Sequence, residues 1–286
     1  MKRFFNYTFA LAAAGLSLLA ACSDDTEVKP KPTLTFNTGT GYTFQDGRQE
    51  NTARLKFGVV STAPSGTKLK QLVIKLSTNG GVAATLKDTA LNGSSLNWDY
   101  DFIVNGAVND KLTLSFTVTA DNGESDTKSI TITIIAPVEA LGEIAGQEIN
   151  NIIGPLKGAY DLEGGVQVGA TEPEATKDLK DLTTATTSNT HKFSQSWGSG
   201  NGSQFVRVTA ADYDNTLNTL QLADLWTAKA SSAAATISNI VKDDVILVRS
   251  GQVTSTYPFF LIRVTDVTLT TGDNNDKIAF KYKKKP

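Results

Sequence analysis

The residue types that most often carry catalysis or bind metals are scarce in this chain. Its 286 residues include one cysteine, Cys22, and one histidine, His191. A multi-histidine zinc site, a Ser-His-Asp triad and a Cys-His dyad all need an imidazole with suitable partners, so a single histidine argues against each of them. No G-x-G-x-x-G or Walker A motif opens a predicted helix. The sequence therefore predicts no nucleotide cofactor and no metal centre.

Carboxylates, in contrast, are plentiful in the second half of the chain. They include Asp161, Asp178, Asp181, Asp212, Asp214, Asp224, Asp243 and Asp244. Two carboxylates can act as acid and base or nucleophile in a glycoside hydrolase, but the sequence marks out no particular pair. Asp273, Asn274 and Asp276 place oxygen ligands suited to calcium in one loop. Their spacing is not that of an EF-hand, and Asx side chains favour turns for backbone reasons, so we interpret this segment as a turn.

One aromatic residue is a candidate for ligand binding. Trp197 borders the glycine-rich residues 198–202, and an indole face can stack on the C–H groups of a sugar. Ser199 and Asn201 in the same segment can hydrogen-bond to hydroxyls. We therefore predict a glycan site at Trp197, Ser199 and Asn201; the alternative interpretation makes Trp197 a core residue at the end of a strand. Trp226 recurs with Leu222 and Leu225 on an apolar helical face and is predicted to be core.

The amino-terminal segment indicates export. A cationic start, Met1-Lys2-Arg3, precedes the mostly apolar residues 4–19, as in a signal peptide. Leu19-Ala20-Ala21-Cys22 then resembles the lipobox of bacterial lipoproteins. The resemblance implies cleavage before Cys22 and acylation of its thiol and of the new amino terminus. We predict a signal peptide over residues 1–21 and a lipid anchor at Cys22; the alternative is an ordinary signal peptide with a chance cysteine.

Residues 22–32 are predicted to form a tether. Pro30 and Pro32 favour an extended, semi-rigid segment. The acidic cluster in residues 23–27 resembles the surface-export signal of lipoproteins from the Bacteroidota, and its other interpretation is a solvated linker. The resemblance implies an outer-membrane lipoprotein that is exposed at the cell surface.

The charge balance argues against a nucleic-acid partner. Residues 1–21 hold two of the 27 Lys and Arg residues and no acid, which leaves 25 cations, 29 acids and a net charge of −4. Binding to phosphates needs a concentrated basic face. The basic cluster Lys281, Lys283, Lys284 and Lys285 is explained by an edge strand or a chain end.

Residues 33–136 alternate between apolar and polar residues, as half-buried strands do. The clearest apolar faces are Leu112/Leu114/Phe116/Val118 and Ile130/Ile132/Ile134. About seven short strands in about 100 residues indicate a two-sheet sandwich. The segment resembles the immunoglobulin-like or fibronectin-like domains that follow the tether in many Bacteroidota surface lipoproteins. Only the architecture is implied, because the cysteines of true immunoglobulin domains are missing. Trp98, in phase with Tyr100 and Phe102, is predicted to be core.

Asp88-Thr89-Ala90 in this domain resembles the short acceptor sequence for O-glycosylation in Bacteroides-type bacteria. The resemblance makes Thr89 a candidate glycosylation site. Three residues also match such a sequence by chance.

The remainder of the chain is predicted to be a second, β-rich domain. Residues 137–157 lack a clean period and are assigned to a junction, either a short helix or an extended segment. Residues 158–286 show strand patterns interrupted by one or two short helices, one after Asp212 as a possible N-cap and another over residues 233–240. Residues 205–215, 242–251 and 273–284 are similar to C-terminal domains of Bacteroidota lipoproteins without an assigned activity. The fold class is mainly β, with an immunoglobulin-like sandwich followed by a β-rich domain.

These observations favour a lipid-anchored outer-membrane or cell-surface protein that binds a glycan or a partner protein without catalysis. A structural or adhesive role in the envelope is the first alternative. A two-carboxylate glycoside hydrolase is the second, because the acids of the second domain provide the residue types.

Overall fold

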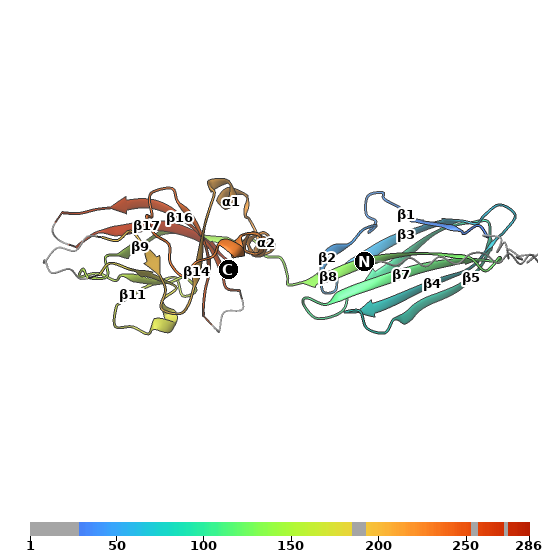
Figure 1. Ribbon diagram of the computed structural model, residues 1–286, viewed down its shortest axis with the longest axis horizontal. Helices are drawn as coiled ribbons and strands as arrows, with labels where there is room; N and C mark the ends of the chain where they lie inside the picture. Colours follow the sequence, from blue (N-terminus) through green and yellow to red (C-terminus); the bar gives the residue numbers. More distant parts are fainter. Residues whose placement is uncertain (1–28, 185–192, 253–256, 272–273) are drawn as a thin grey trace, which may run out of the picture. The chain divides into compact units, whose positions relative to one another are not determined.

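The computed structural model describes residues 29–184, 193–252, 257–271 and 274–286, and the chain is mainly β (Figure 1). It forms two compact units, Met1–Ile134 and Ile135–Pro286. Cys22 and His191 lie outside the described residues. No helix in the described part of the chain is long and apolar enough to span a membrane.

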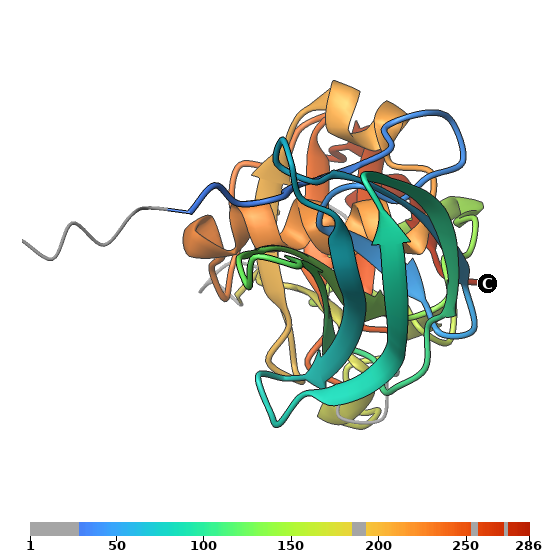
Figure 2. The same ribbon diagram turned by 90° about the vertical axis from the view of Figure 1, so that its right-hand side faces the viewer.

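The first unit is a sandwich of two sheets, formed by the blue-to-green strands of Figures 1 and 2. One sheet has the order β1-β3-β6, with β1 Thr33–Phe36, β3 Arg54–Thr62 and β6 Ser95–Ile103. The other has the order β2-β8-β7-β4-β5, with β2 Gly47–Glu50, β4 Leu69–Thr78, β5 Ala84–Gly93, β7 Lys111–Ala120 and β8 Ser125–Ile135. This arrangement is consistent with the predicted immunoglobulin-like sandwich.

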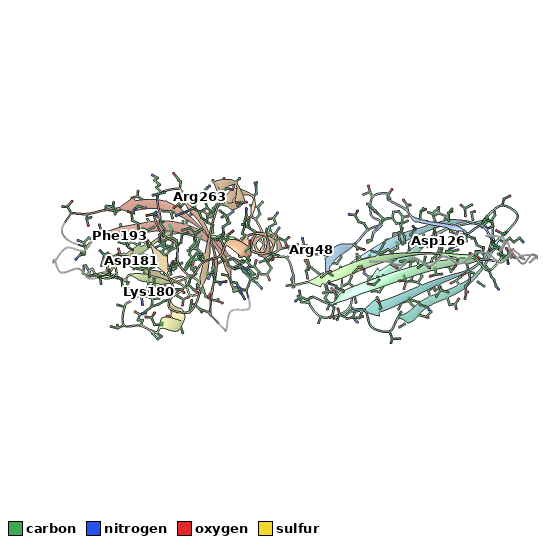
Figure 3. The ribbon with its side chains drawn as sticks, viewed as in Figure 1. Arg48, Asp126, Lys180, Asp181, Phe193 and Arg263 are labelled. Atoms are coloured by element: carbon green, nitrogen blue, oxygen red, sulfur yellow. The ribbon has the colours of Figure 1, made fainter. Side chains whose placement is uncertain are left out.

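The core of the first unit is built from the alternating apolar faces. Leu112, Leu114, Phe116 and Val118 on β7 are buried, as are Ile130, Ile132 and Ile134 on β8, as predicted. The ring of Phe116 lies 5.1 Å from that of Phe36 and 5.3 Å from that of Phe57, which joins the two sheets. Trp98 is half-buried against this core. The carboxylate of Asp126 accepts a 2.9 Å hydrogen bond from the Leu34 amide and ties β8 to β1 (Figure 3).

The second unit also has two sheets, with helices on the outer face of the larger one. The larger sheet has the order β14-β15-β16-β17-β9, with β14 Gln204–Val208, β15 Val245–Arg249, β16 Phe259–Thr268, β17 Lys277–Lys284 and β9 Gly142–Asn150. The smaller sheet has the order β11-β10-β12-β13, with β11 Val166–Val168, β10 Ala159–Asp161, β12 Leu179–Asp181 and β13 Trp197–Gly198.

Two apolar layers flank the larger sheet. One lies between the sheets and includes Tyr160, Trp197, Ile246 and Phe280. The other lies under helices α1 Ala210–Asn215 and α2 Thr219–Lys229. Residues 245–248 of β15 are buried on both faces, as their continuous apolar run predicted.

The helices differ from the prediction in detail. Thr209, not Asp212, is the N-cap of α1; its side chain accepts from the Asp212 amide, and Asp212 accepts in return from the Thr209 amide. Asn218 caps α2. The helix expected over 233–240 is absent, because that segment pairs instead with strand residues, through bridges from Ala234 to Phe205 and from Ile237 to Trp197.

Of the two conformations predicted for residues 137–157, the structure has the extended one over residues 142–150, but this segment belongs to the second unit and is not a junction. Residues 142–150 form β9, which pairs with β17 as the edge strand of the larger sheet. The sequence of β9 has no clean period because the strand lies at the edge of the sheet and its pairing with β17 shifts in register between Phe280 and Tyr282. Glu139 already exchanges hydrogen bonds with Thr219, so the second unit holds the chain from there onward.

Limited proteolysis should therefore cut first between Ile135 and Glu139, where Ala136 and Pro137 are exposed between β8 and the first contacts of the second unit. A broad-specificity protease acting on the folded chain should leave two fragments that begin and end near this segment, as mass spectrometry would show. An earlier cut inside β9 would contradict its place in the sheet.

Candidate functional site

Trp197 cannot serve as an exposed platform, so that prediction is wrong. Its side chain is 0% exposed, and its ring contacts Phe280 edge-on at a centroid distance of 5.7 Å. The Trp197 amide donates to the Ile237 carbonyl, and the Ile237 amide donates to the Trp197 carbonyl, both at 2.8 Å. The segment 233–240, which was expected to be helical, thus covers Trp197. Trp197 itself is the first residue of β13.

Ser199 and Asn201 hold their own loop together. The Ser199 hydroxyl accepts from the Gly202 amide at 3.1 Å. The Asn201 side-chain amide donates to Asp178 at 2.8 Å, and its oxygen accepts from the Ser203 hydroxyl at 2.6 Å. The predicted saccharide contacts of both residues are therefore replaced by contacts within the protein.

Thr89 is also unsuited to its predicted modification in the folded chain. Its Oγ1 atom is buried and has no hydrogen-bond partner among the described residues. Thr89 lies opposite Leu72 of β4. Its hydroxyl is therefore not available to a glycosyltransferase once the sheet has formed.

A buried carboxylate, Asp178, organises the neighbouring loops. Its Oδ1 accepts from Ser250 Oγ at 2.5 Å and from Asn201 Nδ2 at 2.8 Å. Its Oδ2 accepts from the Leu162 amide at 2.9 Å and from Gln252 Nε2 at 3.1 Å. These donors, with a longer contact of 3.3 Å from Ser203 Oγ to Oδ1, fill the roughly four acceptor positions of a carboxylate. We call this set, Asp178 with Leu162, Asn201, Ser250 and Gln252, the Asp178 network.

Burial raises the pKa of Asp178 above its ordinary value, although the hydrogen bonds from Ser250, Asn201 and Leu162 act in the opposite direction. The carboxylate is 0% exposed. Because its oxygens are occupied by protein donors, the network fixes loop positions rather than presenting a free carboxylate to a ligand.

The structure does bring two of the predicted carboxylates together. Gln252 Nε2 lies 3.2 Å from Asp161 Oδ1 and 3.1 Å from Asp178 Oδ2. Asp181 lies apart, where it accepts from the Ile152 amide at 3.0 Å and from Ser194 Oγ at 3.1 Å (Figure 3). These contacts give Asp178 and Asp181 structural roles.

Other predicted acids also have partners within the protein. Asp244 pairs with Arg207 at 2.9 Å, and Asp214 pairs with Arg263 at 3.0 Å. Asp276 is buried and accepts from the Thr270 amide at 2.8 Å. Asp273 lies outside the described residues. Within the described ranges, no group of three or more His, Cys, Asp or Glu side chains is arranged to hold a metal ion.

A pocket of about 420 Å³ opens beside the Asp178 network, at the ends of β14, β15 and β16. We call it the Arg249 pocket; its lining is Gly202, Gln204, Arg249, Ser250, Gly251, Gln252 and Pro258. This volume lies within the range of about 300–1,000 Å³ that is usual for small-molecule sites. The pocket is the candidate functional site.

Glycine is required in one wall of the pocket. A Cβ atom added to Gly251 would lie 2.0 Å from the Asn201 carbonyl oxygen, so the two loops approach backbone to backbone. The Gly251 amide donates to Ser203 Oγ at 3.2 Å. The loops 199–203 and 250–252 are thus held by direct contact and by the Asp178 network below them.

Gln204 and Arg249 provide the polar side chains of the pocket. They are directly opposite one another on β14 and β15, so both side chains lie on the same face. Both residues are exposed. In the described part of the chain, neither side chain has a hydrogen-bond or ion-pair partner, whereas Arg207 and Arg263 are paired with Asp244 and Asp214. Their donors and the Gln204 acceptor are available to a ligand.

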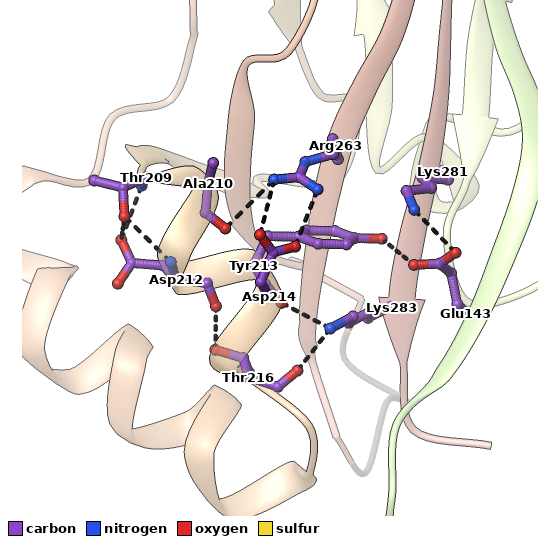
Figure 4. Close-up of polar contacts among 10 residues, drawn as sticks. All are labelled: Glu143, Thr209, Ala210, Asp212, Tyr213, Asp214, Thr216, Arg263, Lys281 and Lys283. Atoms are coloured by element: carbon purple, nitrogen blue, oxygen red, sulfur yellow. Dashed lines mark hydrogen bonds and ion pairs between the residues drawn. The ribbon is translucent and has the colours of Figure 1, made fainter.

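A second polar cluster surrounds Tyr213 on α1 (Figure 4). The Tyr213 hydroxyl donates to Glu143 at 2.8 Å, and Lys283 Nζ donates to the Tyr213 and Thr216 carbonyls at 2.7 and 3.0 Å. Arg263 lies 4.8 Å from the centre of the ring. Burial and the Glu143 carboxylate raise the pKa of Tyr213, and burial lowers that of Lys283. These groups satisfy one another and fix α1 to the sheet, so we assign the cluster a structural role.

No sequence feature points directly to the Arg249 pocket. Arg249 follows the apolar run 245–248, and Gln204 precedes another strand, but neither residue belongs to a motif. Only the antiparallel register of β14 and β15 brings them together.

Comparisons with known proteins found distant structural likenesses. No protein-family model matches the chain, and no curated protein matches it. A solved structure of a DUF4466 family protein from Parabacteroides merdae is similar at 12% identity with a TM-score of 0.34, over 88% of this chain and 97% of that one. The sporulation control protein Spo0M from Bacillus subtilis is similar at 8% identity with a TM-score of 0.26, over 81% and 77% of the two chains. These scores are too low to assign the chain to either fold.

Proposed function

We propose that this chain is a lipid-anchored protein of the outer membrane or cell surface, of the type found in the Bacteroidota, which binds a glycan without catalysis. The Arg249 pocket is the binding site, and the first unit is a spacer. The observation that carries the proposal is the pairing of Gln204 and Arg249 across β14 and β15, with no partner for either side chain among the described residues.

The chemistry of the pocket suits recognition of a polyhydroxylated ligand. The Gln204 amide can both donate to and accept from hydroxyls, and the Arg249 guanidinium provides further donors. The carboxylates nearest to the pocket support binding rather than hydrolysis. Asp178 is saturated by donors of the protein, and Gln252 stands between it and Asp161. A two-carboxylate hydrolase needs both groups free to exchange protons or to attack.

A glycan array probed with the chain from Ser23 onward tests this proposal, because this chain keeps every described residue. We expect binding to at least one glycan class and its loss in a Gln204→Ala/Arg249→Ala variant. Arg207→Ala is the matched control, since Arg207 is an exposed arginine on β14 that is paired with Asp244 outside the pocket. An array without binding, or binding that the double variant retains, would rule out the proposed site.

The membrane anchor is tested separately by Cys22→Ser. We expect the mature protein to move from the detergent phase to the aqueous phase on phase separation, because acyl chains on Cys22 supply the membrane affinity at about 0.8 kcal/mol per buried methylene. The variant must be compared after removal of residues 1–21. A cleaved Cys22→Ser protein that still enters the detergent phase would contradict the lipoprotein assignment.

A structural or adhesive role is the alternative, and one feature of the first unit favours it. Strand β5 is an end strand of its sheet, and most of its residues are exposed. Such an edge can pair with a strand of another chain. A photoreactive group at Leu86, which is 39% exposed, would then capture a neighbouring envelope protein in cells. Absence of any captured protein would count against this alternative.

A further inference from the structure

We propose that the ligand of the Arg249 pocket carries a carboxylate, as an acidic saccharide of the uronic-acid or sialic-acid type does. This inference rests on the proposed glycan binding and narrows it to one ligand class. It follows from the charge, the geometry and the surroundings of Arg249.

The charge of the pocket comes from one residue. Arg249 is the one charged side chain among the residues that line it. An exposed guanidinium without an ion pair keeps its planar array of donors available, and that array matches the two oxygens of a carboxylate. A ligand carboxylate would therefore bind in a bidentate manner, while a neutral sugar would leave the charge uncompensated.

The register of the sheet sets the neighbours of Arg249. Gln204 lies opposite it on β14, and Phe259 lies opposite it on β16, so the three side chains form a row on one face. The half-buried Phe259 ring lies 5.9 Å from the ring of Trp226 and 5.4 Å from that of Tyr257. Phe259 thus packs beside the pocket, while Gln204 and Arg249 line it and provide an amide for the hydroxyl groups and a guanidinium for the carboxylate of an acidic sugar.

The nearest buried acid does not oppose an anionic ligand. Both oxygens of Asp178 are occupied, and two of its donors, Ser250 Oγ and Gln252 Nε2, belong to residues that line the pocket. The side chains of Ser250 and Gln252 therefore compensate the Asp178 carboxylate from the pocket side. Gln252 Nε2 also donates to Asp161 Oδ1 at 3.2 Å, and Arg249 is the charged group among the residues that line the pocket.

Calorimetric titration of the chain from Ser23 onward tests the inference with matched saccharides. The probes are galacturonate oligosaccharides beside their methyl esters, and sialyllactose beside lactose. We expect at least one acidic member to bind about tenfold or more tightly than its neutral counterpart, as a charge-assisted bidentate contact allows. Added salt should weaken the binding of the acidic member.

Arg249→Gln should remove this preference, with the affinity for the acidic member falling about tenfold or more, to that of the neutral member. Arg207→Gln is the control and should bind as the wild type does. Thermal unfolding of both variants confirms that they fold. Equal affinity for acidic and neutral members, or an Arg249→Gln variant that keeps the preference, would overturn the inference while leaving glycan binding intact. Failure of every saccharide here and on the array would overturn both proposals.

Discussion

Replacement of Trp197 by alanine is expected to lower the free energy of unfolding of the second unit by about 3–5 kcal/mol. The side chain is fully buried in the layer between the two sheets, against Phe280. Among the described residues of the unit, Trp197 is the largest fully buried side chain, and its truncation leaves a cavity in a close-packed layer.

Urea unfolding measures this loss, with Trp98 as the reporter of the first unit. The transition of the first unit should not move, since its core is separate. Trp197→Phe should cost less, because the indole Nε1 atom is buried and finds no acceptor in the described part of the chain, so its removal relieves an unpaired donor. A loss below about 2 kcal/mol for Trp197→Ala would show that the side chain is not part of a packed core.

Asp178→Ala is expected to cost about 3 kcal/mol or more, or to prevent folding of the second unit. The substitution leaves the donors of Leu162, Asn201, Ser250 and Gln252 without their acceptor, and each buried donor left unpaired costs about 1–3 kcal/mol. Asp214→Ala provides the matched control. Asp214 is 62% exposed and paired with Arg263, and such surface pairs contribute about 0–1 kcal/mol. Equal losses for the two variants in urea unfolding would contradict the role of the network.

The same residue predicts a dependence of stability on pH. Burial raises the pKa of Asp178 in the folded state above its ordinary value of 3.8, so the folded state binds the proton more tightly than the unfolded state. The contribution of Asp178 to the stability of the second unit should therefore fall as pH rises from about 4 through the folded-state pKa, whereas Glu143, Glu172, Glu174 and Asp212, whose pKa values are lowered, act in the opposite direction. Burial raises the pKa of Asp181 as well and adds to this slope.

Asp178→Asn should flatten the part of the slope that this carboxylate contributes. The measurement is urea unfolding between about pH 4 and 8 for both proteins, with Trp98 again reporting the first unit. A slope that is the same in the wild type and in Asp178→Asn would show that the carboxylate is not protonated preferentially in the folded state.

The periodic parts of the fold were predictable from the sequence. Every second residue of a strand lies on the same face. The alternation of apolar residues over Leu112–Val118 and Ile130–Ile134 therefore predicted two strands and the face of each that is buried. The apolar run at 245–248 likewise predicted a strand covered on both sides. The hairpin of β10 and β11 followed from Gly164 and Gly165, the second of which has a φ of 69°.

Segments whose conformation depends on distant partners were not predictable. The alanine-rich residues 233–236 favour a helix locally, but Phe205 and Trp197 pair with this segment and hold it extended. The burial of Trp197 follows from the same contact. Strand β9 has weak periodicity of its own and is ordered by its pairing with β17, more than 120 residues away.

The candidate site could not be predicted either, because it also depends on contacts between distant parts of the chain. Gln204 and Arg249 become neighbours through a strand register. The donors to Asp178 come from three separate places in the chain, Leu162, Asn201 and the segment with Ser250 and Gln252. In the sequence Asp178 is one of several acids, and nothing there identifies the residues that face it. The composition of single segments carries no information about such cross-strand contacts.

A crystal structure of the chain from Ser23 onward, grown with the saccharide that binds most tightly on the array, tests the central claim most directly. The account predicts that the saccharide occupies the Arg249 pocket, with the Arg249 guanidinium and the Gln204 amide within about 2.7–3.2 Å of its oxygens. A saccharide bound on the first unit, or elsewhere on the second unit with the Arg249 pocket empty, would contradict it.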